Sequence, residues 1–212
     1  MKRICVFCGS SFGVNPAYIK AARDLGNAIA KRNICLVYGG ARVGLMGEIA
    51  STVIRAKGEV IGVIPKDLVE KEVAHSNLSE LRIVGSMHER KSLMAELSDG
   101  FIAMPGGFGT IEEIFEVITW AQLSFHDKPC GFLNINGYYD NLIKFLNHAV
   151  GENFIVPEHR AMIIIDDDPE TLLDKFSNYA PPIFDKAKWI LGMMPKEERD
   201  ELNKKNNVNR ES

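Results

Sequence analysis

The sequence predicts a single α/β domain with a doubly wound, mainly parallel sheet and helices on both of its faces. Short apolar runs rich in Ile and Val alternate along the chain with longer amphipathic segments. These runs are almost continuously apolar, which is typical of strands buried on both faces of a parallel sheet. A chain of 212 residues with a hydrophobic fraction of 46% is long enough to bury one such core.

Seven apolar runs are predicted as strands. They span residues 4–8, 34–38, 59–64, 81–84, 100–104, 130–135 and 162–166. Helices are predicted between them at about residues 16–32, 44–57, 86–98, 110–125, 138–150 and 168–178. Strands that alternate with helices indicate βαβ units. The pattern leaves the order of the strands in the sheet open.

Capping signals support three of the helix starts. Asn15 is suited to an N-cap and Pro16 to the first helical position. Ser86 and Glu89 have the S-x-x-E spacing of a capping box. The Asp-Asp-Pro sequence at residues 167–169 starts the last predicted helix in the same way as Asn15 and Pro16.

The domain is expected to span residues 1–195. The polar residues 196–212 are expected to form a frayed or disordered C-terminal tail. The segment from residue 65 to residue 81 is polar and weakly periodic. It has two interpretations, a mobile flap beside a site or a partly helical crossover.

The charge and the apolar pattern argue against two classes of partner. A net charge of −3 gives no sign of the basic surface that usually marks a nucleic-acid-binding protein. No apolar stretch approaches the roughly 18–20 residues of a membrane span. The apolar run near the N-terminus is shorter than the ~7–15 residues of a signal peptide core. We therefore expect a soluble cytoplasmic protein that binds neither nucleic acid nor membrane.

Cys5 and Cys8 form a C-x-x-C pair, a spacing that can indicate a redox or metal site. They lie in a predicted strand, where side chains alternate between the two faces, so the two thiols should point to opposite sides. We expect all four cysteines to be buried and unpaired. The five histidines have no ligand spacing, and His88-Glu89 lacks the second His of H-E-x-x-H, so no metal site is predicted.

Small residues follow three of the predicted strands, at residues 9–11, 39–47 and 105–110. In doubly wound sheets ligands bind outside the carboxyl ends of the strands. Glycines there allow backbone N–H groups to face a phosphate, and the start of a helix adds its partial positive charge. The glycines match neither a Walker A loop nor G-x-G-x-x-G. One glycine turn is usually only a turn, but three such ends favour a nucleotide or sugar-phosphate site.

Acidic residues follow the third glycine loop directly. Negative charge is favourable at a helix N-terminus, and this explains Glu112. Glu113 and Glu116 are three residues apart and share a helix face. A carboxylate beside an anion pocket is repelled by the anion unless it serves the ligand. A sugar phosphate would suit a glycine loop followed by a carboxylate, with its phosphate bound by the loop and its ribose bound by the acid.

The segment IFEVITWAQL, residues 114–123, is apolar on nearly every side of a helix. Such a helix is buried. In a protein with one domain, part of that surface should be covered by a second subunit. We expect a homodimer.

The motif Met87-x-x-Arg90-Lys91, followed by Pro105-Gly-Gly-x-Gly-Thr-x-x-Glu113, resembles the signature of the LOG ("Lonely guy") family of cytokinin riboside 5′-monophosphate phosphoribohydrolases. The segments CVFCGSS, YGG-x-x-x-GLMG, VITWAQL, HDKP, NINGYYD and PEHR extend the resemblance over about residues 3–178. Ala41 stands where many members have a third glycine, and alanine should be tolerated if its φ is negative.

The resemblance implies a Rossmann-like fold, a homodimer and a hydrolase that needs no cofactor. Members cleave the N-glycosidic bond of N6-prenylated AMP, and some of them that of AMP, giving free base and ribose 5-phosphate. Many members carry an old lysine decarboxylase label, but no lysine here is marked out for a Schiff base and nothing indicates a pyridoxal phosphate site.

By the same resemblance, the catalytic residues are Arg90 and Glu113. The residues expected to bind the substrate are Gly9, Ser10, Gly40, Met87, Lys91, Gly106, Gly107, Gly109, Thr110 and Glu116.

In the expected mechanism Glu113 stabilises an oxocarbenium-like transition state. Arg90 orients Glu113 or polarises the purine, and Met87 borders the base. The alternative is a nucleotide or molybdenum-cofactor carrier without catalytic activity on the same fold.

Overall fold

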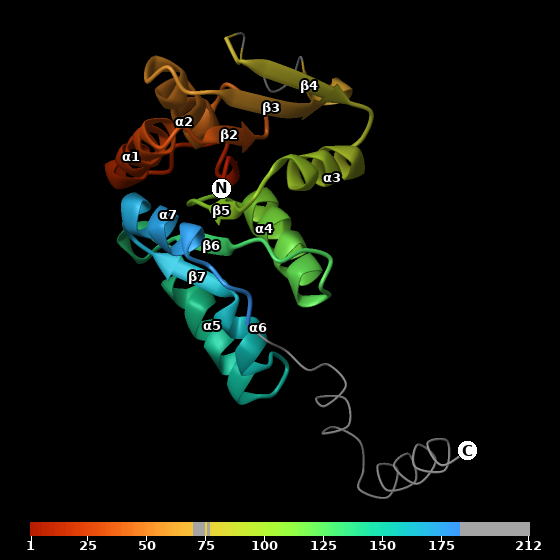
Figure 1. Cartoon of the computed structure of the whole chain (residues 1–212). Helices are drawn as coiled ribbons and strands as arrows, with labels where there is room; N and C mark the ends of the chain where they lie inside the picture. The colour runs from red at the N-terminus through yellow and green to blue at the C-terminus, as the bar shows by residue number, and fades with distance from the viewer. Residues whose placement is uncertain (70–74, 76, 183–212) are drawn as a thin grey trace, which may run out of the picture. The chain divides into compact units, whose positions relative to one another are not determined.

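Seven parallel strands form one sheet in the computed structural model of the chain, which describes residues 1–69, 75 and 77–182 (Figure 1). The strands are β1 (Arg3–Phe7), β2 (Cys35–Tyr38), β3 (Val60–Pro65), β4 (Glu80–Val84), β5 (Phe101–Ala103), β6 (Cys130–Leu133) and β7 (Ile163–Asp166). Their order in the sheet is β4-β3-β2-β1-β5-β6-β7, and every neighbouring pair is parallel. All seven predicted strands are confirmed.

Helices cover both faces of the sheet, as predicted. They are α1 (Pro16–Lys31), α2 (Gly44–Arg55), α3 (Met87–Leu97), α4 (Phe108–Gln122), α5 (Asp140–Gly151), α6 (Pro157–Ala161) and α7 (Pro169–Ser177). Residues of α1, α2 and α7 pack in the core on one face, and those of α3, α4 and α5 pack in the core on the other. The six predicted helices are confirmed with small shifts of their ends, and the short α6 was not predicted.

The strands supply alternate residues to the two cores. In β1, Ile4 and Val6 lie in one cluster and Cys5 and Phe7 in the other. Cys8 lies in the cluster opposite to that of Cys5, and all four cysteines are buried and free. The prediction that Cys5 and Cys8 point to opposite faces is confirmed.

The predicted helix caps are formed by side-chain oxygens. Asn15 Oδ1 accepts a hydrogen bond of 2.9 Å from the backbone N–H of Ala17 at the start of α1. Ser86 Oγ accepts one of 3.1 Å from the N–H of Glu89, and the Glu89 carboxylate accepts one of 2.7 Å from the N–H of Gly85. At α7 it is Asp168 that caps the helix.

Two predictions concern residues that the structure describes only in part or not at all. The contacts of the chain define one unit over Met1–Pro181. The expected domain end at residue 195 and the expected tail at 196–212 lie outside the described residues. Of the segment 65–81, Lys66–Leu68 form the 3-10 turn η1, and residues 70–74 and 76 lie outside the described part.

Successive strands from β2 to β4 are added on one side of β1, and those from β5 to β7 are added on the other side. The strand order therefore reverses at the pair β1–β5. The helix after β1 covers one face of the sheet and the helix after β5 covers the other. The loops at the carboxyl ends of these two strands therefore diverge and leave a crevice, which is where ligands bind in open α/β sheets. Within the described residues, no helix is both long and apolar enough to cross a membrane.

Candidate functional site

The three glycine-bearing loops meet at the crevice between β1 and β5. The N–H of Gly9 donates a hydrogen bond of 3.1 Å to the carbonyl of Pro105, and the N–H of Leu45 donates one of 3.1 Å to the carbonyl of Gly9. Gly44 has a φ of 57°, and a Cβ there would clash with the backbone of Ser10. The three loops that carry small residues therefore pack together through their backbones at the carboxyl edge of the sheet.

The loop after β5 leaves the first turn of α4 open. This helix begins at Phe108, two residues earlier than predicted, and its N-cap is Gly107, with no side-chain hydrogen bond to the first turn. The first N–H groups of a helix have no partner within the helix. A Cβ at Gly107 or Gly109 would meet nothing within 4 Å. A negatively charged group could therefore approach these N–H groups closely.

The neighbouring glycine has a different function. A Cβ at Gly106 would clash with the hydroxyl of Thr110 and would lie 2.9 Å from the N–H nitrogen of Gly9. Thr110 is itself buried in the first turn of α4. Gly106 thus allows the loop after β5, the loop after β1 and the start of α4 to pack together.

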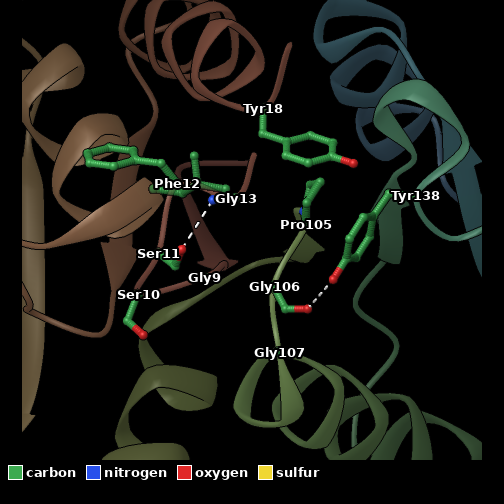
Figure 2. A pocket seen from close by; sticks show the side chains of 11 residues that line it. Gly9, Ser10, Ser11, Phe12, Gly13, Tyr18, Pro105, Gly106, Gly107 and Tyr138 are labelled. Atoms are coloured by element: carbon green, nitrogen blue, oxygen red, sulfur yellow. Dashed lines mark hydrogen bonds between the residues drawn. The ribbon is translucent and has the colours of Figure 1, made fainter. Parts of the chain in front are cut away.

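A cavity of about 290 Å³ opens beside these loops (Figure 2). Its lining residues are Gly9, Ser10, Ser11, Phe12, Gly13, Tyr18, Leu45, Pro105, Gly106, Gly107 and Tyr138. Figure 2 shows the loop from Gly9 to Gly13 on one side and Pro105, Gly106, Gly107 and Tyr138 on the other. The ring of Tyr18 lies between them, next to Gly13 and Tyr138.

Sequence reasoning predicted four of the lining residues to bind substrate, Gly9, Ser10, Gly106 and Gly107, and missed the aromatic ones. Tyr138 belongs to the segment NINGYYD, which was noticed only as part of the resemblance.

The Arg90 and Glu113 side chains form a buried ion pair between α3 and α4. Arg90 Nη1 lies 2.7 Å from Glu113 Oε1, and the two side chains are 9% and 12% exposed. Arg90 Nε also donates a hydrogen bond of 3.1 Å to the carbonyl of Val63 in β3. A Cβ at Gly39 would clash with Arg90 Nη2, so glycine at the end of β2 makes room for the guanidinium.

Burial and charge oppose each other at Glu113. Burial raises the pKa of its carboxyl above the usual value, and the positive charge of Arg90 offsets that rise only in part. Burial and then the negative charge of Glu113 raise the pKa of the Cys8 thiol, which follows β1. Glu113 lies near the start of α4, the helix that begins in the loop after β5 beside the crevice.

A second ion pair joins the same two helices. Lys91 Nζ lies 2.6 Å from Glu112 Oε1 and 3.0 Å from Glu116 Oε1. Hydrogen bonding to Glu112 and Glu116 raises the pKa of Lys91 against the effect of burial. Glu112 thus has a specific partner in addition to its place near a helix N-terminus.

The cavity lining contains neither Arg90 nor Glu113, and the predicted substrate-binding residues Gly40, Met87, Lys91, Gly109, Thr110 and Glu116 also lie outside it. Met87 is the first residue of α3 and is 44% exposed. Gly40 has a φ of 82°, and its carbonyl accepts a hydrogen bond of 3.1 Å from the N–H of His75. Ala41 is not among the residues with positive φ, so alanine is tolerated at this position. In the part of the chain that the structure describes, no three His, Cys, Asp or Glu side chains gather where they could hold a metal ion.

Comparison with known proteins gives close relatives over most of the chain. The family model described as "Possible lysine decarboxylase" matches residues 46–176. A probable cytokinin riboside 5′-monophosphate phosphoribohydrolase from Oryza sativa subsp. japonica is 51% identical over 180 residues, covering 85% of this chain and 79% of the relative. A cytokinin riboside 5′-monophosphate phosphoribohydrolase from Arabidopsis thaliana is also 51% identical over 180 residues, covering 85% and 84%.

Solved structures with a similar fold are more distant in sequence. A molybdenum cofactor binding protein from Rippkaea orientalis has a TM-score of 0.62 and 22% identity, covering 84% of this chain and 97% of that protein. The molybdenum cofactor carrier protein from Chlamydomonas reinhardtii has a TM-score of 0.63 and 19% identity, covering 84% and 96%. At such identities the likeness shows the fold alone.

The geometry of the two ion pairs predicts unequal effects on stability. Replacing Arg90 with Met leaves the Glu113 carboxylate buried without a partner, so the free energy of unfolding should fall by about 3 kcal/mol. Replacing Lys91 with Met should cost about 1 kcal/mol or less, because its pairing with the exposed Glu112 is weak.

Urea unfolding at neutral pH measures both effects. Adding Glu113→Gln to the Arg90→Met protein should recover part of the loss, because no charge then remains buried. Equal losses for the two single variants, without recovery in the double variant, would contradict this description of the pair.

Proposed function

The chain belongs to the LOG family of cytokinin riboside 5′-monophosphate phosphoribohydrolases, and on that premise we propose that it hydrolyses the N-glycosidic bond of purine nucleoside 5′-monophosphates. The products are the free base and ribose 5-phosphate. The substrates are N6-prenylated AMP and AMP. The reaction belongs to hydrolysis at N-glycosyl bonds and not to decarboxylation.

The observation that supports this function most directly is the buried carboxylate of Glu113 close to an open helix N-terminus. Cleavage of a glycosidic bond passes through a transition state in which positive charge develops on the sugar ring. A fixed carboxylate stabilises that charge, and such electrostatic stabilisation commonly supplies several kcal/mol. The phosphate of the same substrate needs donors a short distance away, and the first turn of α4 offers them.

We propose that the 5′-phosphate binds to the backbone of Gly107–Thr110. Three features support this: the first turn of α4 has no side-chain cap, Gly107 and Gly109 leave its approach open, and the partial positive charge of the helix favours an anion. Gly9 and Ser10 line the cavity beside this loop and face the same ligand.

Arg90 is proposed to keep Glu113 ionised and oriented. A neutral carboxyl would not stabilise an oxocarbenium-like transition state, and burial alone favours the neutral form. The guanidinium counters this through Nη1, while Nε is held by the carbonyl of Val63. Since both groups are engaged within the protein, orientation of Glu113 is better supported than polarisation of the purine. Met87, at the exposed start of α3, borders the base.

The predicted substrate contacts of Lys91, Glu116 and Gly40 stay predictions. Lys91 on α3 pairs with Glu112 and Glu116 on α4, which supports a function in holding α3 against α4. A carrier function is not favoured by any contact described above. The cytoplasmic location and the absence of nucleic-acid partners also stay predictions.

Replacing Glu113 with Gln tests the assignment of the carboxylate. The variant keeps the size of the side chain but lacks the charge, so kcat should fall by about 10²–10³-fold. Equilibrium binding of the nucleotide should change little, because the phosphate loop is untouched. The measurement is release of the base, followed by chromatography, together with nucleotide binding by calorimetry.

Glu112→Gln is the matched control. Glu112 precedes Glu113 on the same helix turn, but it is exposed and paired with Lys91. Its kcat should stay within about twofold of the original, as expected for a surface substitution. A Glu113→Gln protein with unchanged kcat would show that the carboxylate is not catalytic.

We also propose that the protein is a homodimer, with the C-terminal part of α4 in the interface. Leu123 and Phe125 follow this helix and are 45% and 74% exposed. Exposed apolar side chains that lie together are typical of protein interaction sites.

Light scattering should give twice the chain mass of 23.6 kDa, and replacing both Leu123 and Phe125 with Glu should give the monomer mass. A monomer mass for the original protein at micromolar concentration would exclude a stable dimer. Circular dichroism of the double variant shows whether it has kept its fold.

A further inference from the structure

The segment from Asn134 to Asp140, NINGYYD, forms a turn that its own side chains fix in place. Asn136 and Gly137 have φ values of 53° and 67°, in the left-handed region that Asn and Gly adopt most readily. Asn134 Oδ1 accepts a hydrogen bond of 2.7 Å from the N–H of Tyr139, and Asn134 Nδ2 donates one of 2.8 Å to Asp140 Oδ1. The turn therefore holds Tyr138 and Tyr139 in defined positions at the end of β6.

The two tyrosines bind two carbonyl groups at the end of the adjacent strand β5. Tyr139 is buried and donates a hydrogen bond of 2.6 Å to the carbonyl of Met104. Tyr138 is 42% exposed and donates one of 2.6 Å to the carbonyl of Gly106 (Figure 2). The second bond thus acts on the loop where α4 begins.

The hydrogen bond from Tyr138 fixes the direction of a whole peptide unit. In a trans peptide the C=O and the following N–H point in opposite directions, and no peptide bond among the described residues is cis. With the Gly106 carbonyl held by Tyr138, the N–H of Gly107 is turned away from that tyrosine. A carbonyl oxygen facing the first turn of α4 would repel an anion, and Tyr138 prevents this.

The hydrogen bond from Tyr139 to the carbonyl of Met104 does not orient an N–H group toward a ligand. The peptide after Met104 leads into Pro105, which has no N–H to offer to a ligand. Tyr139 therefore supports the end of β5 without presenting a donor. The two phenols make chemically similar bonds with different consequences for an anion.

The ring of Tyr138 is held independently of its hydroxyl. It packs edge-to-face on Tyr18 and Tyr139, with centroid distances of 5.6 and 4.9 Å. Removing the hydroxyl alone should therefore leave the ring in place.

We propose that Tyr138 is a positioning residue for phosphate recognition, which holds the Gly106–Gly107 peptide so that its N–H is available to the 5′-phosphate and its carbonyl is not. This inference rests on the proposed function, because it takes the anion to be the phosphate of a nucleoside monophosphate or of ribose 5-phosphate.

The test compares Tyr138→Phe with Tyr139→Phe in the full chain. Titration with ribose 5-phosphate, monitored by calorimetry, should show affinity about tenfold weaker in Tyr138→Phe, the size expected for losing one hydrogen bond. Tyr139→Phe should lower Tm, because it leaves a buried carbonyl without its donor, but should keep that affinity within about twofold.

The kinetic constants distinguish an effect of Tyr138 on substrate binding from an effect on the chemical step. With prenylated AMP, KM of Tyr138→Phe should rise about tenfold while kcat stays within about twofold, because the bond acts on binding. Unchanged affinity for ribose 5-phosphate in Tyr138→Phe, or equal weakening in both variants, would overturn the inference. So would a fall in kcat at unchanged KM.

The binding experiment does not depend on turnover. If the protein binds ribose 5-phosphate but releases no base from any nucleotide, the proposed function fails and the affinities still decide the function of Tyr138. If Tyr138→Phe binds as tightly as the original while base release is observed, only this inference fails. A protein that binds neither ribose 5-phosphate nor any nucleoside monophosphate would contradict both.

Discussion

The buried ion pair between Arg90 and Glu113 is the constraint on which the rest of the site depends. Moving two charges out of water is costly, and the structure offsets that cost with contacts that serve no other evident purpose. Gly39 makes room for the guanidinium, and the carbonyl of Val63 accepts a hydrogen bond from it. The parallel sheet supplies the framework, because α3 and α4 both begin at its carboxyl edge. A buried carboxylate held against a guanidinium is suited to stabilising an oxocarbenium-like transition state.

The proposed phosphate end of the site has the opposite requirement, since it must offer donors and exclude negative charge. Backbone N–H groups meet it at the uncapped first turn of α4, where two glycines leave the approach open. The loop after β1 packs against this turn through Gly9, and the turn before α5 supports it through Tyr138. In the proposed function, the region for an anion thus lies apart from the region for a developing cation, as the two ends of a sugar phosphate require.

Much of this arrangement could be predicted from local sequence signals, and what could not depends on tertiary contacts. Apolar runs and cap residues such as Asn15 and Ser86 identify the strands and most helix starts. The start of α4 was misplaced because Gly107 caps it without a side-chain signal, and α6 is too short to show a helical period. Tyr138 was missed because its partner lies in the loop after another strand, and the sequence leaves the order of strands open. Arg90 and Glu113 were identified through a family signature, and their ion pair follows from the placement of α3 beside α4.

Whether the chain hydrolyses the N-glycosidic bond is measured most directly by the stoichiometry of products from a nucleoside 5′-monophosphate. Incubating the full chain with prenylated AMP and with AMP, then quantifying base and ribose 5-phosphate by chromatography, follows the N-glycosidic bond itself. Hydrolysis by this chain should give equal amounts of the two products, formed catalytically and without any added cofactor. Tight binding of the nucleotide with no base released from any nucleoside monophosphate would contradict it and would indicate a carrier.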